Sequence, residues 1–222
     1  MAAGTTDIYF PSNPKTTARL AGMAYLVIIF CGVTADLVLR APLKDATPEM
    51  LVNLLQSNPG PFRLSLLADI VMVSADIALA LLFFVLLRAA SPTLALAVLV
   101  LRLMQAAVIA ASLVLLTALP GLADAGETGL AQLVFGLHAT GYDIGLVFFG
   151  LNSLLMWRLL SLSGGVPAWI AYAIGSSGLV YITGSVIRIL APDMVGVFEP
   201  AYLLPLVAET SLCLWLLIKA RI

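Results

Sequence analysis

Long apolar runs separated by short polar segments dominate the pattern along this chain. A helix needs about 20 apolar residues to cross a bilayer. By that measure we expect six membrane-spanning helices, at residues 17–40, 62–88, 93–118, 130–158, 168–190 and 201–219. The apolar residues are continuous, which excludes the alternating pattern of a membrane β-barrel. The pattern therefore predicts an all-α, polytopic membrane protein with six transmembrane helices in one bundle.

The segments between these runs contain residues that start and end helices. Between spans one and two, Thr47 and Pro48 are typical of an N-cap and a first helical position, and they begin a short amphipathic helix, EMLVNLLQ. We expect this helix to lie at the membrane interface and residues 58–61 to end it. Residues 120–129 are predicted to be an acidic loop, and 192–200 a turn.

The composition supports the membrane class. Of 222 residues, 62% are hydrophobic and only 10% are charged, which is too little charge for a soluble domain of this length. The net charge of −1 provides no basic surface for nucleic acid. Cys31 and Cys213 fall in apolar spans at different depths, so we interpret them as packing residues. Residues 1–15 are expected to be a polar tail, and residues 16–222 the transmembrane domain.

The positions of lysine and arginine predict an orientation. Cytoplasmic loops are enriched in these residues, and one side of the predicted bundle holds Lys15, Arg19, Arg88, Arg158, Lys219 and Arg221. The tail lacks the basic region of a signal peptide, so the first span is expected to stay as an uncleaved anchor. We expect a protein of the cell (inner) membrane with both termini in the cytoplasm, surrounded by lipid. A membrane-protein partner and a homo-oligomer both remain open.

The fourth span contains the only histidine of the chain and an aspartate five residues later. At about 100° per residue, His138 shares a face with Gly141 and Gly145, whereas Asp143 lies nearly opposite. The G-x-x-x-G spacing lets a neighbouring helix come close. A separate stripe of bulky residues suits lipid: Leu137, Ile144, Phe148, Leu151 and Leu155.

His138 and Asp143 are therefore expected to contact different neighbours. For His138 we expect the group that contains Asp36, Asp69 or Arg188, because these residues have a similar predicted depth. Asp143 is expected to join Arg102 and Glu209 near mid-membrane. Asp36 and Arg40 are four residues apart, and we expect them to pair locally.

The ionisable residues inside the spans are the main candidates for function. An isolated charge at mid-membrane costs at least about 2.5–3.5 kcal/mol. Arg102 keeps its proton and needs a carboxylate, but Asp76, Asp143 and Glu209 compete for it. At least one of the three should therefore be protonated, or face water or a cationic ligand. The candidate residues for a binding site or ionic network are Asp69, Asp76, Arg102, Gln105, His138, Tyr142, Asp143, Arg188 and Glu209.

Several strings, taken together, carry a resemblance to a family. They are, in order, ARLAGMAYLVIIFCG, FRLSLLADIVMVSADIALALLFFVLLR, LRLMQA, HATGYDIGLVFFG, SGGVP and ETSLCLWLLIK. From about Thr16 to Lys219 the chain resembles the bacterial family called domain of unknown function 4386. The most specific part is H-x-x-G-Y-D-x-G-L-x-F-F-G. The resemblance implies a six-span integral membrane protein, and it implies no catalytic or binding residue.

Two interpretations of function remain open. In the first, a polar cavity in the outer half of the bundle binds or transports a small molecule or protons. In the second, the protein is a non-catalytic accessory or structural subunit, and its buried charges form a purely structural network.

An enzyme is the third and least favoured interpretation. The sequence contains no phosphate loop, no H-E-x-x-H and no C-x-x-C, so we expect no catalytic residue, metal or cofactor. Residues 175–178, GSSG, are similar to the G-x-S-G of rhomboid proteases, but here His138 precedes Ser177 in the chain. We interpret this string as small residues that pack against another helix.

Overall fold

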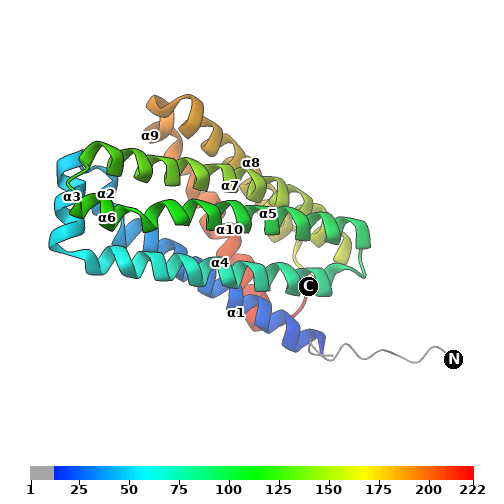
Figure 1. Cartoon of the computed structure of the whole chain (residues 1–222). Helices are drawn as coiled ribbons and strands as arrows, with labels where there is room; N and C mark the ends of the chain where they lie inside the picture. Colours follow the sequence, from blue (N-terminus) through cyan, green and yellow to red (C-terminus); the bar gives the residue numbers. More distant parts are fainter. Residues whose placement is uncertain (1–12) are drawn as a thin grey trace.

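The computed structural model describes residues 13–222 (Figure 1). Residues 1–12, which make up most of the predicted polar tail, lie outside the described residues. The described part contains helices and no strand. Six helical segments are long and apolar enough to cross a membrane: Pro14–Leu39, Pro59–Leu87, Pro92–Asp124, Thr128–Ser163, Ala168–Leu190 and Pro192–Lys219. The predicted six-span, all-α fold is confirmed.

The helices follow one another with short connections. They are α1 (Pro14–Val33), α2 (Ala41–Lys44), α3 (Pro48–Ser57), α4 (Pro59–Leu87), α5 (Pro92–Thr117), α6 (Leu119–Asp124), α7 (Thr128–Ser163), α8 (Ala168–Leu190), α9 (Val195–Phe198) and α10 (Leu203–Lys219). A π-helical segment, Thr34–Leu39, extends α1, and two 3₁₀ turns, Pro192–Met194 and Glu199–Tyr202, flank α9.

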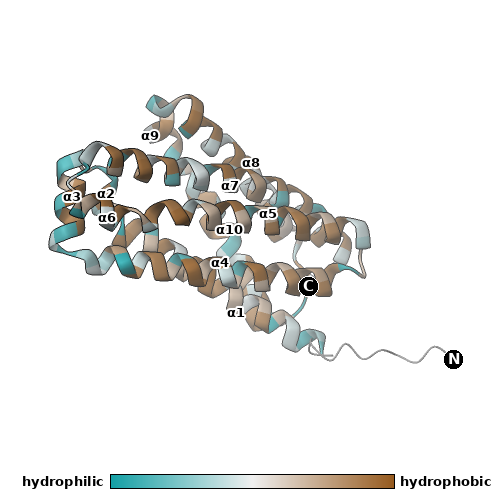
Figure 2. Ribbon diagram, viewed as in Figure 1, coloured by the Kyte–Doolittle hydropathy of each residue, from teal (hydrophilic) through white to brown (hydrophobic). Residues whose placement is uncertain are grey.

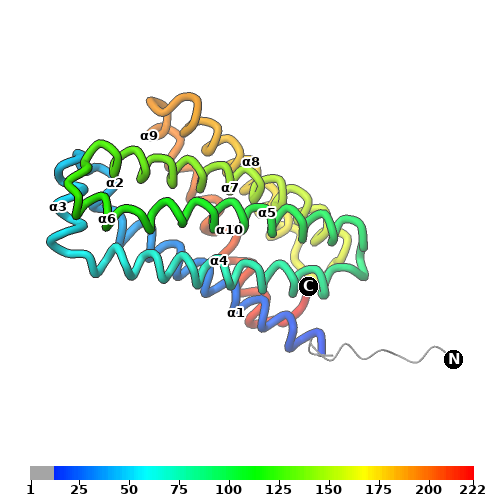
Figure 3. Tube along the Cα trace, viewed as in Figure 1, coloured from blue at the N-terminus to red at the C-terminus, as the bar shows by residue number. Residues whose placement is uncertain are grey.

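The six spanning helices form a closed ring in chain order. Helix α1 packs on α4, α4 on α5, α5 on α7, α7 on α8, α8 on α10, and α10 returns to α1. Among the described residues, α4 and α7 are the only spanning helices whose backbones come close across the ring. The start of α1 and the C-terminal residue lie at the same end of the bundle, which we call the termini end (Figure 3). The ring therefore has an interior onto which all six spans project side chains.

Glycines allow the closest helix contacts. A Cβ atom added at Gly141 would lie 2.7 Å from Ser112 Cβ, and one at Gly145 would lie 2.6 Å from Ile109 Cγ1. The predicted G-x-x-x-G contact is therefore confirmed, with α5 as the neighbour of α7. On the other side of α7, a Cβ atom at Gly178 would lie 2.6 Å from the carbonyl oxygen of Gly150. This confirms that the small residues of GSSG pack a helix.

Two apolar clusters fill the ring at different heights. The cluster near the termini end includes Tyr25, Leu79, Phe83 and Leu212, and the cluster near the far end includes Ile109. Between these clusters the interior carries charged and polar side chains. The outer faces of the spans are mostly apolar, and polar residues gather at the connections (Figure 2). Such a surface suits a lipid environment.

The connection between spans one and two is close to the prediction. Thr47 caps α3, because its Oγ1 accepts a hydrogen bond from the Met50 amide at 3.3 Å. Helix α3 buries Leu51, Val52 and Leu55 and packs on α6 and α7 at the far end of the bundle. Its apolar face is therefore covered by protein.

Two connections differ from the prediction. The expected acidic loop at 120–129 begins with helix α6, because Pro120 fits its first turn and Leu119 is fully buried. The expected turn at 192–200 consists of short helical turns. Span two begins at Pro59, before the expected residue 62, because a proline in the first helical turn needs no amide partner.

Candidate functional site

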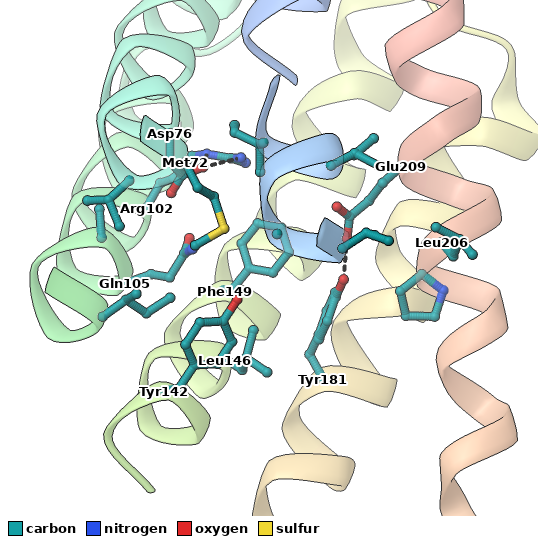
Figure 4. Close-up of a pocket in the computed structure, with 18 of the residues that line it drawn as sticks. Met72, Asp76, Arg102, Gln105, Tyr142, Leu146, Phe149, Tyr181, Leu206 and Glu209 are labelled. Atoms are coloured by element: carbon teal, nitrogen blue, oxygen red, sulfur yellow. Dashed lines mark hydrogen bonds and ion pairs between the residues drawn. The ribbon is translucent and has the colours of Figure 1, made fainter. Parts of the chain in front are cut away.

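A cavity of about 190 Å³ lies inside the ring, in the half away from the termini end. Its walls come from α1, α4, α5, α7, α8 and α10 (Figure 4). The polar residues that line it are Asp76, Arg102, Gln105, Tyr142, Tyr181, Tyr202 and Glu209. A space of this size holds several water molecules or a small organic molecule.

A buried ion pair between α4 and α5 forms one wall of the cavity. Arg102 donates to Asp76 Oδ1 from Nε at 2.8 Å and from Nη2 at 2.5 Å. The guanidinium carbon lies 5.1 Å from the centroid of the Phe149 ring and 5.6 Å from that of Tyr25. A guanidinium is attracted to aromatic faces at such distances. The charge of Arg102 is therefore held by Asp76 and by aromatic rings of the ring interior.

Two acceptor oxygens in the same wall have no donor. Both hydrogen bonds from Arg102 reach Oδ1 of Asp76, and its Oδ2 has no hydrogen-bond partner among the described residues. The same holds for Oε1 of Gln105. Asp76 is 3% exposed and Gln105 is 8% exposed. A buried acceptor without a donor costs about 1–3 kcal/mol, so both oxygens favour any hydrogen-bond donor that comes within reach.

The opposite wall carries a second carboxylate. The Tyr181 hydroxyl donates to Glu209 Oε1 at 2.5 Å, and Figure 4 shows this pair across the cavity from Asp76 and Arg102. Within residues 13–222, Glu209 forms no salt bridge. The lining therefore contains two carboxylates and one guanidinium, an excess of one negative charge when both acids are ionised.

Aromatic rings complete the lining. The ring centroids of Phe149 and Tyr181 lie 5.0 Å apart, and those of Tyr181 and Tyr202 lie 6.0 Å apart, both in edge-to-face geometry. Tyr142 projects into the same space from α7 (Figure 4). These rings offer apolar faces beside the polar atoms of the two walls.

The cavity reaches the surface between α1 and α10. Two of its lining residues are exposed, Val33 at 39% and Leu206 at 47%. Towards the termini end the same helices touch, because Cys213 Sγ donates to the Gly22 carbonyl at 3.4 Å. The side chains at the mouth are apolar, so the entrance lies on the lipid-compatible surface of the bundle.

Comparison with known proteins places the chain in a family. The model of the family described as domain of unknown function (DUF4386) matches residues 20–220. The chain belongs to this family. No curated protein and no solved structure matches it. Membership in DUF4386 agrees with the predicted resemblance, and this DUF4386 protein is a membrane-spanning helical protein.

Other predicted site residues of this DUF4386 protein lie in separate contacts outside the cavity. Asp69 pairs with Arg40, and both carboxylate oxygens accept from the guanidinium, with almost no exposed surface on either residue. The expected pairing of Asp36 with Arg40 is wrong, because Asp36 accepts from Lys44 at 2.7 Å. The π-helical segment Thr34–Leu39 explains the difference. In i→i+5 geometry, residues four apart no longer lie one above the other.

Asp143 and His138 contact different neighbours, as predicted, but these neighbours were not predicted correctly. Asp143 accepts from Arg188 Nη1 at 3.0 Å, so its expected place with Arg102 and Glu209 is wrong. It lies on the α8 side of α7. His138 Nδ1 donates to the Ser112 carbonyl at 3.2 Å, in place of the expected contact with Asp36, Asp69 or Arg188. The histidine is buried, and it does not line the cavity.

The nine predicted residues thus divide into two sets. Asp76, Arg102, Gln105, Tyr142 and Glu209 line one cavity, whereas Asp69, His138, Asp143 and Arg188 form separate contacts between helices. Sequence reasoning missed Tyr181, Tyr202 and Phe149 as lining residues, although Tyr181 shares a helix face with Arg188.

The geometry also limits the chemistry of the site. Ser177 donates to the Ala173 carbonyl within its own helix, whereas His138 bonds to α5, so they form no serine–histidine dyad. Over residues 13–222 there is no group of three histidine, cysteine or acidic side chains that could hold a metal ion.

Proposed function

We propose that this DUF4386 protein binds a small molecule in the cavity between Asp76 and Glu209. The observation that carries the proposal is the cavity itself, whose lining includes three residues with a buried polar atom that has no partner within residues 13–222: Asp76 Oδ2, Gln105 Oε1 and the Tyr202 hydroxyl. Binding sites combine a mostly apolar, concave lining with a few convergent polar groups. The arrangement here fits that description.

A second candidate function is supported by the charges outside the cavity. In the pair of Arg40 and Asp69, both oxygens of the carboxylate are bonded, and neither residue lines the cavity. Asp143 and Arg188 likewise join α7 to α8. These pairs have the character of a structural network, as expected for an accessory subunit. Asp76 differs from Asp69, because it lines the cavity and its Oδ2 has no hydrogen-bond partner among the described residues.

Binding is the part of the proposal that the geometry supports most directly. The cluster near the termini end, with Tyr25, Phe83 and Leu212, closes the ring on one side of the cavity. Transport would therefore require that cluster to open. The distribution of lysine and arginine supports the further proposal that this closed side faces the cytoplasm.

Access of a small reagent to the cavity tests the proposal. The parent protein carries Cys31→Ala and Cys213→Ala, and one cysteine is added as Leu146→Cys, which lines the cavity (Figure 4). Leu79→Cys is the matched control, because Leu79 is fully buried in the cluster near the termini end. The probe is neutral methyl methanethiosulfonate, and mass spectrometry in mild detergent measures the rate of labelling.

We expect the cysteine at position 146 to react at least about tenfold faster than the one at position 79, since only the first adjoins open space. No labelling at position 146 would mean a sealed core, and would favour the accessory-subunit function. Equal rates at both positions would also contradict the proposal, because the reagent would then enter through a general loss of packing.

A further inference from the structure

We infer that the ligand is a small, amphipathic amine in its protonated form, which enters through the apolar mouth between α1 and α10. This inference rests on the proposed function and names the chemical class that the site would take. The charge of the lining, its hydrogen-bonding capacity, its aromatic rings and the position of the entrance all favour this class.

The charge of the lining favours a monocation. Arg102 is paired with Asp76, whereas Glu209 contacts a tyrosine hydroxyl and no cation among the described residues. In a low-dielectric interior an unpaired carboxylate is costly. When both acids are ionised, one bound positive charge would bring the sum over Asp76, Arg102 and Glu209 to zero. An anion would instead add to the excess negative charge.

The wall formed by α4 and α5 contains two acceptors that suit an N–H donor. Asp76 Oδ2 and Gln105 Oε1 are acceptors without partners, on the wall opposite Glu209 (Figure 4). A primary ammonium group offers three donors and no acceptor. Once a side-chain rotation turns these oxygens towards the cavity, it could donate to them while its charge faces the carboxylates, which a quaternary ammonium group without N–H could not do.

The remainder of the lining favours an apolar substituent on the amine. Phe149, Tyr181 and Tyr202 form a chain of edge-to-face rings along the cavity, and aromatic faces attract organic cations. The mouth is formed by exposed Val33 and Leu206. A molecule with an apolar part can partition into lipid and reach this entrance from the side of the bundle, whereas a hydrated inorganic ion meets apolar side chains there.

A pair of reagents of opposite charge tests the class of ligand. The cysteine of Leu146→Cys is labelled with 2-aminoethyl methanethiosulfonate, a cation, and with 2-sulfonatoethyl methanethiosulfonate, an anion. An exposed Ser57→Cys variant provides the intrinsic ratio of the two rates. We expect the ratio of cationic to anionic labelling rates to be at least about tenfold higher at position 146 than at position 57. A change of this size is the effect of one charge at short range in a partly buried site.

Variants and competitors sharpen the same experiment. Glu209→Gln should remove most of the preference, whereas Asp143→Asn should keep it, because Asp143 is paired with Arg188 outside the cavity. Butylammonium chloride should slow labelling at Leu146→Cys by the neutral reagent at least about threefold. Equal concentrations of sodium butyrate, 1-butanol and sodium chloride should not do so.

The outcomes separate the inference from the proposed function. If the neutral reagent labels position 146 but the cationic reagent is not preferred over the anionic one, the ligand is not an amine. The proposed binding cavity would still be supported. Equal protection by sodium chloride would overturn it in favour of an inorganic cation. If Glu209→Gln fails to fold, the test still rests on Leu146→Cys with an intact Glu209. The ratio of its labelling rates by the two charged reagents and the competition by butylammonium then decide whether the ligand is an amine. A cavity that no reagent reaches would overturn both proposals.

Discussion

The pairing of Arg102 with Asp76 leads to a quantitative prediction about stability. Replacing Arg102 with leucine removes both hydrogen bonds to Asp76 Oδ1 and leaves the carboxylate in a site where it is 3% exposed. Breaking a buried ion pair by removing one partner costs about 3–5 kcal/mol. The lost contacts with the faces of Tyr25, Phe83 and Phe149 add to the loss. We therefore expect Arg102→Leu to lower the free energy of unfolding by at least about 3 kcal/mol.

A second substitution should restore part of that loss. In Arg102→Leu with Asp76→Asn, the stranded charge is gone and only a neutral amide remains to be buried. Burying a neutral polar group without a partner costs about 1–3 kcal/mol. About half of the stability lost in Arg102→Leu should therefore return. Asp143→Asn in the Arg102→Leu background is the matched control. It removes a carboxylate that is paired with Arg188, so it should restore nothing.

Equilibrium unfolding in mixed micelles of dodecyl maltoside and sodium dodecyl sulfate, followed by circular dichroism, measures these free energies. The cycle of single and double variants gives the coupling energy between Arg102 and Asp76. Equal rescue by Asp76→Asn and Asp143→Asn would refute the specific pairing. An Arg102→Leu variant as stable as the parent would refute the claim that the pair lies in a low-dielectric interior.

Three further predictions concern other parts of the bundle. Gly145→Ala should destabilise the protein by about 1–3 kcal/mol, because its Cβ would lie 2.6 Å from Ile109 Cγ1. Gly129→Ala, where a Cβ meets no other atom, should change stability by less than about 0.5 kcal/mol in the same assay. Asp69→Asn should cost about 3 kcal/mol or more, and a loss below about 1 kcal/mol would mean that its buried ion pair is screened by water. In intact cells, an impermeant maleimide added outside should label a cysteine at the exposed position 53 but not one at exposed position 90, and the reverse pattern would invert the proposed orientation.

Much of the fold follows from the sequence, because lipid imposes simple rules on each segment. A span must be apolar over about 20 residues, and its polar residues must turn away from lipid. These rules are local, so the six spans were predictable one by one, as was the glycine face of α7 that packs on α5. Asp69 and Asp76 are seven residues apart, which puts them on one face of a helix, and both are buried.

The ion pairs were less predictable, because a pairing depends on which helices are neighbours and how each is rotated. Depth along the membrane normal suggested that Asp143 and Glu209 would share Arg102. In the ring, however, the Asp143 flank of α7 faces α8 and meets Arg188. Arg40 was assigned to Asp36 on the assumption of regular α-helical geometry, and the π-helical segment turns it towards α4 instead.

The sequence by itself therefore determined the class of protein, the number of spans and the residues that must avoid lipid. The tertiary structure alone decided which of those residues meet. It leaves Asp76, Gln105 and Glu209 around one cavity, and it pairs Asp69 and Asp143 with arginines elsewhere. The physical reason is that burial constrains each residue separately, whereas a charge is neutralised only by a partner brought within a few ångströms by the packing of another helix.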